Sequence, residues 1–362
     1  MKFYDREKEL DLLNQIENKA AQNAQMTFVI GRRRIGKTAL LTKAYKDKTL
    51  YFFVTKKNEA LLCEEYISEI KNKLNITVYG EFKNFKSLFS YLMDLSKSQK
   101  FTLIIDEFQE FLSINPSIYG DMQYIWDLNK DNSSINLILC GSIYSLMNKI
   151  FENSKEPLFG RATAKLNLHP FSTATIKEII KDYKRSYDNE DLLAMYMFSG
   201  GIAKYIESFV QAKAFTNMDI INEIFSTNSL FLDEGKNVLI DEFGKDYSNY
   251  FSILTLIASS KTSRNEMESI MQIELGGFLD KLEKDFALIS KVRPIFAKPS
   301  SRSVKYKIID NFLNFWFRFI YKNRGAVEMR NYKLVKDILK RDYQTYSGII
   351  LEKYFIQKLS EE

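Results

Sequence analysis

Residues 31–38 read GRRRIGKT and fit the pattern G-x-x-x-x-G-K-[ST] without a mismatch, between the strand-like run MTFVI and a segment with helical periodicity. The two glycines let backbone N–H groups turn toward phosphates, and the N-terminus of the following helix favours an anion. Lys37 is expected to reach the β and γ phosphates of ATP, and the Thr38 hydroxyl to ligate Mg²⁺. The alternative is a basic turn between a strand and a helix. The predicted nucleotide contacts are Gly31, Arg32, Arg33, Arg34, Ile35, Gly36, Lys37, Thr38 and Ala39.

A second group of chemically competent residues ends the apolar run FTLIIDE at 101–107. Unpaired carboxylates are costly to bury, so two acids at the end of a buried strand suggest a site. Asp106 is predicted to bind Mg²⁺ through water, and Glu107 to orient and polarise the attacking water as a base. The alternative is that both acids form the polar end of a strand.

Composition narrows the classes of metal site. The chain of 362 residues has two cysteines and one histidine, too few for a disulfide framework or a His/Cys zinc site, so carboxylates are the expected metal ligands. The charged N-terminus MKFYDREKEL does not resemble a signal peptide, and no stretch suits a membrane span. We therefore expect a cytoplasmic protein without membrane contact. The net charge of +6 permits nucleic-acid binding without indicating it.

Short β-branched and aromatic runs alternate with amphipathic stretches over the first 170 residues, which predicts an α/β fold with parallel strands. The strand at 136–140 is expected beside the phosphate-loop strand, the order typical of P-loop ATPases with an additional catalytic glutamate. Ser142, just after this strand, is either a sensor of the γ-phosphate or the N-cap of the next helix. The predicted strands are 27–30, 50–54, 101–105, 136–140 and 165–168.

The remainder of the chain has other patterns. Helical spacing dominates 171–240, and three helical stretches then precede two strand-like runs at 287–292 and 304–309, which predicts a winged-helix arrangement. Ser263 and Glu266 have capping-box spacing, indicating a helix start. The expected domains are a P-loop ATPase core at 1–172, a helical lid at 173–240, a winged helix at 241–321 and a helical tail at 322–362.

These segments together resemble the archaeal-type prokaryotic P-loop ATPases of the AAA+/STAND group, which are often fused to a C-terminal nuclease-like domain. The resemblance implies a P-loop NTPase (AAA+/STAND-like) parallel sheet core with a helical lid and a C-terminal winged-helix domain. The similar segments, in order, are FYDREKELDLL, GRRRIGKTALL, IIDEFQEF, LILCGSIYSLM, PLFGRATAKLNLHPF, FSGGIAKYIE and IIDNFLNFWFRFIY.

Several roles follow from this resemblance alone. It implies that the turn at Arg6 and Glu7 flanks the adenine. It also implies that Arg161 senses the γ-phosphate, either within its own chain or as a finger in a neighbouring subunit of a homo-oligomer, with a salt-bridged surface residue as the alternative. Gly200 and Gly201 match the lid motif, although Ala203 stands where the family has proline.

The segment SGIILE at 347–352 resembles the opening of the nuclease-like domain. The later acidic and lysine residues that a nuclease needs for its metal do not follow it. We therefore expect no nuclease activity from this chain, as in a shortened member of the group.

Two features bear on nucleic-acid binding. The two wing strands and their loop carry six cations and no acid, whereas the helix in the recognition position reads DKLEKD, whose acids repel phosphates. A solvated basic loop and a weak, sequence-independent contact both remain open. The aromatic run at 312–321 is expected to be core. The six cations are Lys291, Arg293, Lys298, Arg302, Lys305 and Lys307.

The leading hypothesis is a Mg²⁺-dependent ATPase in which the γ-phosphate acts as the ligand of a conformational switch among core, lid and winged helix. The alternative is a DNA-binding or regulatory module in which ATP is mainly a structural or assembly ligand.

Overall fold

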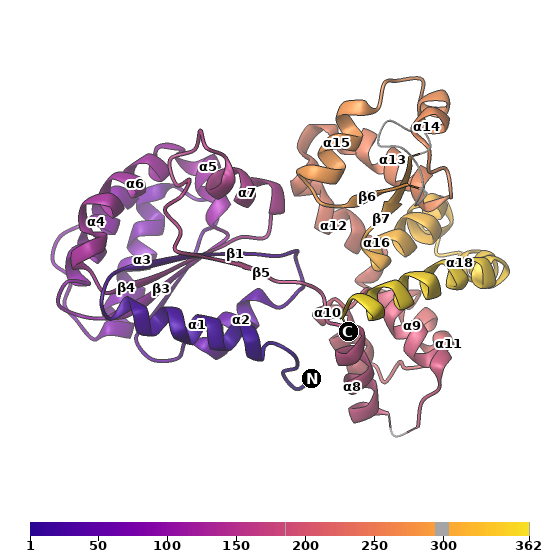
Figure 1. Ribbon diagram of the computed structural model, residues 1–362, viewed down its shortest axis with the longest axis horizontal. Helices are drawn as coiled ribbons and strands as arrows, with labels where there is room; N and C mark the ends of the chain where they lie inside the picture. The colour runs from indigo at the N-terminus through magenta and orange to yellow at the C-terminus, as the bar shows by residue number, and fades with distance from the viewer. Residues whose placement is uncertain (185, 294–303, 362) are drawn as a thin grey trace. The chain divides into compact units, whose positions relative to one another are not determined.

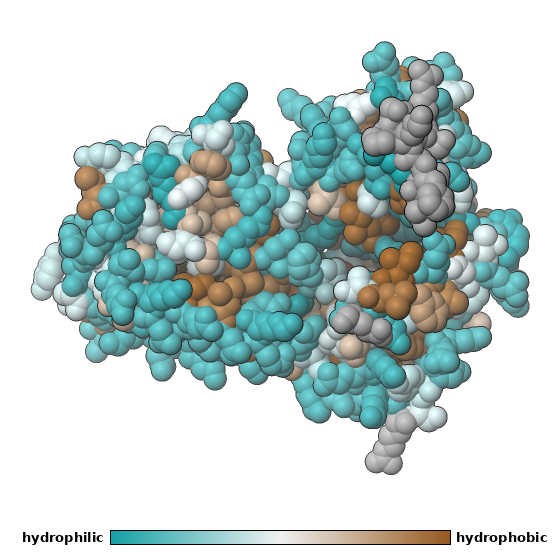
Figure 2. Space-filling view, viewed as in Figure 1, coloured by the Kyte–Doolittle hydropathy of each residue, from teal (hydrophilic) through white to brown (hydrophobic). Residues whose placement is uncertain are grey.

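The computed structural model describes residues 1–184, 186–293 and 304–361 of the chain. The chain forms two compact units, of which one comprises residues 6–169 and the other residues 1–5 together with 170–361. Hydrophilic residues cover most of the face that Figure 2 shows. Among the described residues, no helix is both long and apolar enough to cross a membrane.

The unit of residues 6–169 is built on a five-stranded sheet in the order β2-β3-β4-β1-β5 (Figure 1). All neighbouring strands are parallel, which confirms the predicted α/β class and places β4 directly between the phosphate-loop strand and the acidic strand. Every residue of β1, β3 and β4 is buried, which explains their uninterrupted apolar sequences. The strands are β1 (Gln25–Ile30), β2 (Thr49–Phe53), β3 (Phe101–Asp106), β4 (Ile135–Cys140) and β5 (Ala164–Asn167).

Helices cover both faces of this sheet. In Figure 1, α1 and α2 lie on one face and α4 to α7 on the other. Side chains of Asn58 and Asn84 cap the N-termini of α3 and α4 by accepting hydrogen bonds from backbone N–H groups. The elements are α1 (Glu7–Ala20), α2 (Lys37–Ala44), α3 (Glu59–Leu74), α4 (Phe85–Leu95), η1 (Phe108–Glu110), α5 (Phe111–Ile114), α6 (Ser117–Asn129), η2 (Lys130–Asn132) and α7 (Tyr144–Glu152).

The other unit is mainly helical. Its described residues contain the expected helical region, then three helices and an antiparallel strand pair in the order predicted for a winged helix. Ser263 accepts the hydrogen bond of Glu266 N at 3.4 Å, so the predicted helix start there is confirmed. The first elements are α8 (Thr173–Tyr183), α9 (Asn189–Ser199), α10 (Ala203–Gln211), α11 (Asn217–Ile224) and α12 (Phe231–Phe243). They are followed by η3 (Gly244–Asp246), α13 (Tyr247–Ala258), α14 (Arg264–Met271), α15 (Gly276–Lys284), β6 (Ile289–Val292) and β7 (Lys305–Ile308).

The aromatic run after β7 forms the core of this unit, as predicted. Its side chains from Phe312 to Ile320 are buried apart from Asn314 and Arg318, and Trp316 Nε1 donates to the Leu232 carbonyl at 3.0 Å. The run bends through a π-helical turn, η4, which lets apolar residues face several neighbouring helices. The last elements are α16 (Asn311–Phe315), η4 (Trp316–Ile320), η5 (Tyr321–Asn323), α17 (Arg324–Glu328) and α18 (Tyr332–Glu361).

Gly235 allows helix α12 to pack closely against the indole ring of Trp316. A Cβ atom at this position would lie 2.2 Å from Trp316 Cδ2 and would therefore clash with the buried indole ring. We expect Gly235→Ala to lower the free energy of unfolding by roughly 1–2 kcal/mol in urea titrations, because overpacking outweighs the gain in helix propensity. Gly348→Ala on α18 is the matched control, since its Cβ meets nothing within 4 Å. That control should stabilise the unit by about 0.5–1 kcal/mol, and equal responses of the two variants would contradict the packing argument.

Candidate functional site

The phosphate loop lies between β1 and α2 in the geometry that its sequence predicts. Gly36 adopts a φ of 100°, which glycine tolerates, and serves as the N-cap of α2 without a side-chain cap. Lys37, the first residue of the helix, is 8% exposed and donates to the carbonyl oxygens of Gly31 at 2.6 Å and Arg32 at 3.2 Å. Burial lowers the pKa of Lys37, and the nearby carboxylates of Glu107 and Asp106 oppose this shift. The loop thus surrounds a buried ammonium group whose charge a bound phosphate would neutralise.

Asp106 ends β3 beside this loop. Its side chain is 5% exposed, and its Oδ2 lies 3.4 Å from the hydroxyl of Thr38, which donates to it. The hydroxyl of Tyr51, from the adjacent strand β2, donates to the same Oδ2 atom. A hydroxyl and a carboxylate at this distance are hard oxygen donors, so the residues present fit Mg²⁺ with phosphate and water oxygens completing its shell. Among the described residues there is no cluster of three or more His, Cys, Asp or Glu side chains able to hold a metal without such oxygens.

Glu107 lies next to Asp106 in a left-handed backbone conformation, with a φ of 54°. Its Oε2 accepts hydrogen bonds from Ser142 Oγ at 2.7 Å and from Gln109 Nε2 at 2.5 Å. Ser142, which follows β4, also accepts from Arg33 Nε of the phosphate loop at 3.4 Å. The structure therefore brings Lys37, Thr38, Asp106, Glu107 and Ser142 together at the carboxyl ends of β1, β3 and β4.

Ser142 is not the N-cap of the following helix, which was one of the two alternatives. The helix α7 has Ile143 as its N-cap residue and no side-chain cap. The hydroxyl of Ser142 is instead directed to Glu107, one element away along the sheet edge. Its role as a γ-phosphate sensor stays a prediction.

Arg161 contacts another part of this unit. Its Nη2 lies 3.2 Å from Asp127 Oδ2 on α6, and its Nη1 donates to the Phe159 carbonyl at 2.8 Å. This pair matches the salt-bridged alternative, and a γ-phosphate role would require Arg161 to leave Asp127. Arg6 is 6% exposed and donates to the His169 carbonyl at 2.8 Å. This hydrogen bond joins the first and last residues of the unit.

Sequence reasoning missed two residues that hold the acids. Tyr51 holds Asp106, and Gln109 is 1% exposed with its Nε2 on Glu107, while its Oε1 has no hydrogen-bond partner among the described residues. A polar-tipped residue in a strand next to the acidic strand was the available signal for Tyr51. For Gln109 the signal was an amide residue two positions after the predicted base.

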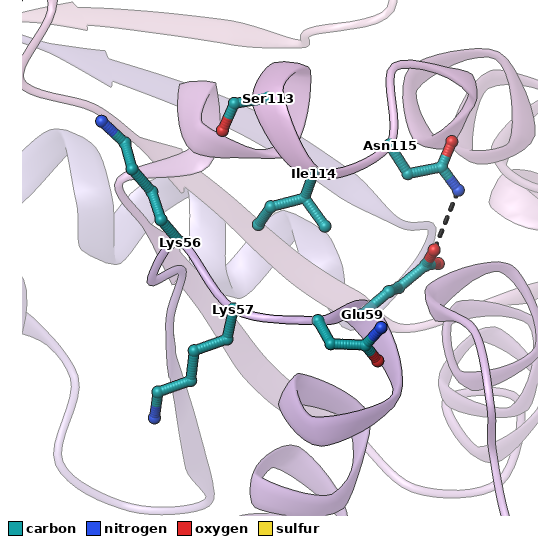
Figure 3. Close-up of a pocket in the computed structure, with 7 residues that line it drawn as sticks. Lys56, Lys57, Glu59, Ser113, Ile114 and Asn115 are labelled. Atoms are coloured by element: carbon teal, nitrogen blue, oxygen red, sulfur yellow. Dashed lines mark hydrogen bonds between the residues drawn. The ribbon is translucent and has the colours of Figure 1, made fainter.

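An open cavity of about 540 Å³ lies in the same unit, between the loop after β2 and the segment after η1. Figure 3 shows Glu59 and Asn115 facing each other, joined by a hydrogen bond of 2.9 Å. The other carboxylate oxygen of Glu59 accepts from Phe85 N at 2.7 Å. Lys56, on the β2 side, lies 3.6 Å from Glu110. These contacts brace the segment that carries Glu107 against α3 and α4.

Acidic side chains pair with two of the cations that form the basic surface predicted for the wing. Lys291 on β6 forms ion pairs with Glu283 at 2.5 Å and Asp280 at 3.2 Å, both on α15, and Lys307 on β7 lies 3.5 Å from Glu352. Lys298 and Arg302 lie outside the described residues. Weak nucleic-acid binding through the wing stays a prediction.

Comparisons with known proteins identify a family for this chain. Residues 3–209 match the profile of a family described as an ATPase domain predominantly from Archaea. An uncharacterised protein of Methanocaldococcus jannaschii is 28% identical over 353 residues, covering 97% of this chain and 76% of the relative.

Solved structures show the same fold at low sequence identity. A Walker-type ATPase of Pyrococcus abyssi aligns with a TM-score of 0.65 and 17% identity, over 87% of this chain and 96% of that one. The ORC2 protein of Aeropyrum pernix, solved in ADPNP–ADP complexes, aligns with a TM-score of 0.60 and 13% identity, over 91% and 96% of the two chains. The fold is therefore that of P-loop ATPases of the AAA+ type.

Proposed function

The chain belongs to the family of ATPase domains found predominantly in Archaea, and from this membership we propose that it binds ATP with Mg²⁺ and hydrolyses it to ADP and phosphate. One observation supports the proposal above the others. Three features lie together at the carboxyl ends of the strands. They are the buried ammonium group of Lys37, the Thr38 hydroxyl that donates to Asp106, and the Glu107 carboxylate that accepts from Ser142. Such groups can bind the phosphates and Mg²⁺ and orient the attacking water in phosphoryl transfer.

Binding begins at Lys37 on this proposal. In the structure its three N–H groups are directed partly to the carbonyls of Gly31 and Arg32, which are weaker partners than a phosphate oxygen. The lysine moves from these carbonyls to the β and γ phosphates, and the backbone N–H groups of the loop hold the remaining oxygens. Mg²⁺, when bound, neutralises part of the phosphate charge, with Thr38 and Asp106 as its protein partners.

Glu107 then acts on the attacking water. Water attacks the γ-phosphorus, the bond from that phosphorus to the β–γ bridging oxygen breaks, and Glu107 orients the water and accepts its proton. Ser142 and Gln109 both donate to its Oε2 in the structure, and these two hydrogen bonds hold the carboxylate in position. Ser142 is thereby suited to link the γ-phosphate to the position of the base.

The finer proposal is that the γ-phosphate works as the ligand of a switch. A phosphate at Ser142 competes with Glu107 for the same hydroxyl, so the nucleotide state changes the hydrogen bonds of the base and of Arg33. The first test of the whole proposal is calorimetric titration with ATP and ADP, with and without Mg²⁺. Failure of both nucleotides to bind would reject it.

Tyr51 offers a sharper test of the metal-handling part. We expect Tyr51→Phe to keep ATP binding in EDTA but to raise the Mg²⁺ concentration that half-saturates the tightening of binding, roughly tenfold, because Asp106 loses a charge-assisted hydrogen bond. The measurement is ATP affinity as a function of Mg²⁺ concentration. Tyr79→Phe, at a tyrosine that is 86% exposed in the same unit, is the matched control. An identical Mg²⁺ dependence in both variants would remove Tyr51 from the site.

A further inference from the structure

A small cationic cavity of about 140 Å³ lies in the mainly helical unit, away from every residue of the phosphate loop in sequence. Three of its lining residues are cations, Arg318, Lys322 and Arg341, and one is a carboxylate, Asp342. Three positive charges and one negative charge leave a net charge of +2 on the lining. Such an imbalance around a confined space favours an anion.

Arg318 is held in place by the core. Its Nη1 donates to the carbonyl of Ala258 at 3.1 Å, and its guanidinium lies 5.6 Å from the ring centroid of Phe319 and 5.5 Å from that of Tyr346. Stacking on two rings and a carbonyl contact use only part of the five-donor fork of an arginine. The guanidinium is thus oriented before any ligand binds.

Arg341 is oriented by its neighbour on α18. Its Nε and Nη2 donate to the two carboxylate oxygens of Asp342 at 2.7 and 3.1 Å, a bidentate pair. Arg341, with additional contributions from Arg318 and Lys322, lowers the pKa of Asp342. Lys322 forms no salt bridge with any described carboxylate and is exposed.

Three uncharged residues, Ser259, Asn323 and Ile338, complete the lining. Ser259, which follows α13, has a buried Oγ atom with no hydrogen-bond partner among the described residues. An orphaned buried hydroxyl costs free energy unless a ligand or water satisfies it. Because Ser259 is a lining residue, an oxyanion in the cavity is a candidate partner for this hydroxyl.

We propose that this cavity binds one phosphate group, free or carried by a small phosphate monoester. The net charge of the lining balances a phosphate monoester, which carries about −1.5 to −2 at pH 7. The volume is several times the roughly 30 Å³ that one water occupies in the liquid, so a tetrahedral oxyanion fits. Arg318 and Arg341 each have five N–H donors, of which their protein contacts use only a part, so the remaining donors can bind its oxygens, and Lys322 adds a point charge. None of the lining residues belongs to the proposed ATP site, so the proposal does not rest on ATP binding.

The test measures phosphate binding with the phosphate loop disabled. Calorimetric titrations of Lys37→Ala protein with inorganic phosphate, and separately with glycerol 3-phosphate, are made at low ionic strength. In this background the double variant Lys322→Gln/Arg341→Gln should bind the tighter of the two ligands roughly tenfold or more weakly, because two charged donors are lost. The control Lys333→Gln/Lys340→Gln removes the same charge from exposed positions of α18 that do not line the cavity, and should bind as before.

The two ligands identify the source of the phosphate, since tighter binding of the monoester indicates an organic ligand and tighter binding of inorganic phosphate a free ion. Wild-type protein saturated with a non-hydrolysable ATP analogue gives a second background, so that the test survives misfolding of Lys37→Ala. The proposal is wrong if neither ligand binds in either background, or if the two double variants lose affinity equally. A DNA duplex is titrated as a third ligand. The proposal is also wrong if the affinity of the two double variants differs for the duplex and for neither phosphate ligand.

Discussion

Lys37→Ala should abolish detectable binding of ATP. When ATP binds, the ammonium group of Lys37 exchanges its two backbone carbonyl partners for oxygens of the β and γ phosphates. Charge-assisted hydrogen bonds of this kind contribute about 1.5–3 kcal/mol each. Loss of both corresponds to an affinity that is roughly 10² to 10⁴ times weaker. Titration calorimetry with ATP in the presence of Mg²⁺ measures this directly.

The same substitution should leave the fold intact. Lys37 is a buried cation whose pKa is lowered by desolvation, so the ligand-free protein gains little from its charge. The melting temperature without nucleotide is expected to stay near that of the wild type. Lys43→Ala, at an exposed position on the same helix, is the matched control and should bind ATP as the wild type does. Equal ATP affinity of Lys37→Ala and Lys43→Ala would show that the phosphate loop does not hold the nucleotide.

Glu107→Gln should separate binding from hydrolysis. The amide keeps the size of the side chain and can still accept from Ser142, so ATP affinity is expected to stay within a few-fold of the wild type. It cannot accept a proton from water, and loss of a general base lowers the rate by about 10² to 10⁴. The measurement pairs ATP affinity with single-turnover phosphate release.

Glu110→Gln is the control for this substitution. Glu110 lies three residues further on and pairs with Lys56 at 3.6 Å. Its variant should turn over ATP at nearly the wild-type rate. Unaltered turnover in Glu107→Gln would remove Glu107 from the mechanism, while a slow Glu110→Gln with a normal Glu107→Gln would move the base to Glu110.

Much of the core could be predicted because its signals are local. Consecutive apolar residues predicted buried parallel strands, and the glycine-bounded loop predicted the bend before α2. The aromatic run was predicted as core from its spread around a helix, and the structure confirms that burial. The π-helical turn inside the run was not predicted, because it reflects how several neighbouring helices pack together.

The contacts of the candidate site were less accessible to sequence reasoning. Tyr51 meets Asp106 only because β2 and β3 pair in a register that places Tyr51 opposite Ile104, two residues before the acid. The two possibilities for Ser142 were indistinguishable in sequence, since a γ-phosphate sensor and an N-cap need the same hydroxyl, and its contact with Glu107 was not predicted. Lys291 and Lys307 looked like an unopposed basic surface because their acidic partners lie on other elements, α15 and α18.

Phosphate release from ATP by the purified wild-type chain tests the central claim most directly. The assay compares excess Mg²⁺ with excess EDTA at ATP concentrations that calorimetry shows to be saturating, with Lys37→Ala as the blank. The account predicts steady release in Mg²⁺, none above the blank in EDTA, and one ADP formed for each phosphate. Saturated protein that releases no phosphate in Mg²⁺ would contradict it, and would leave ATP as a structural or assembly ligand.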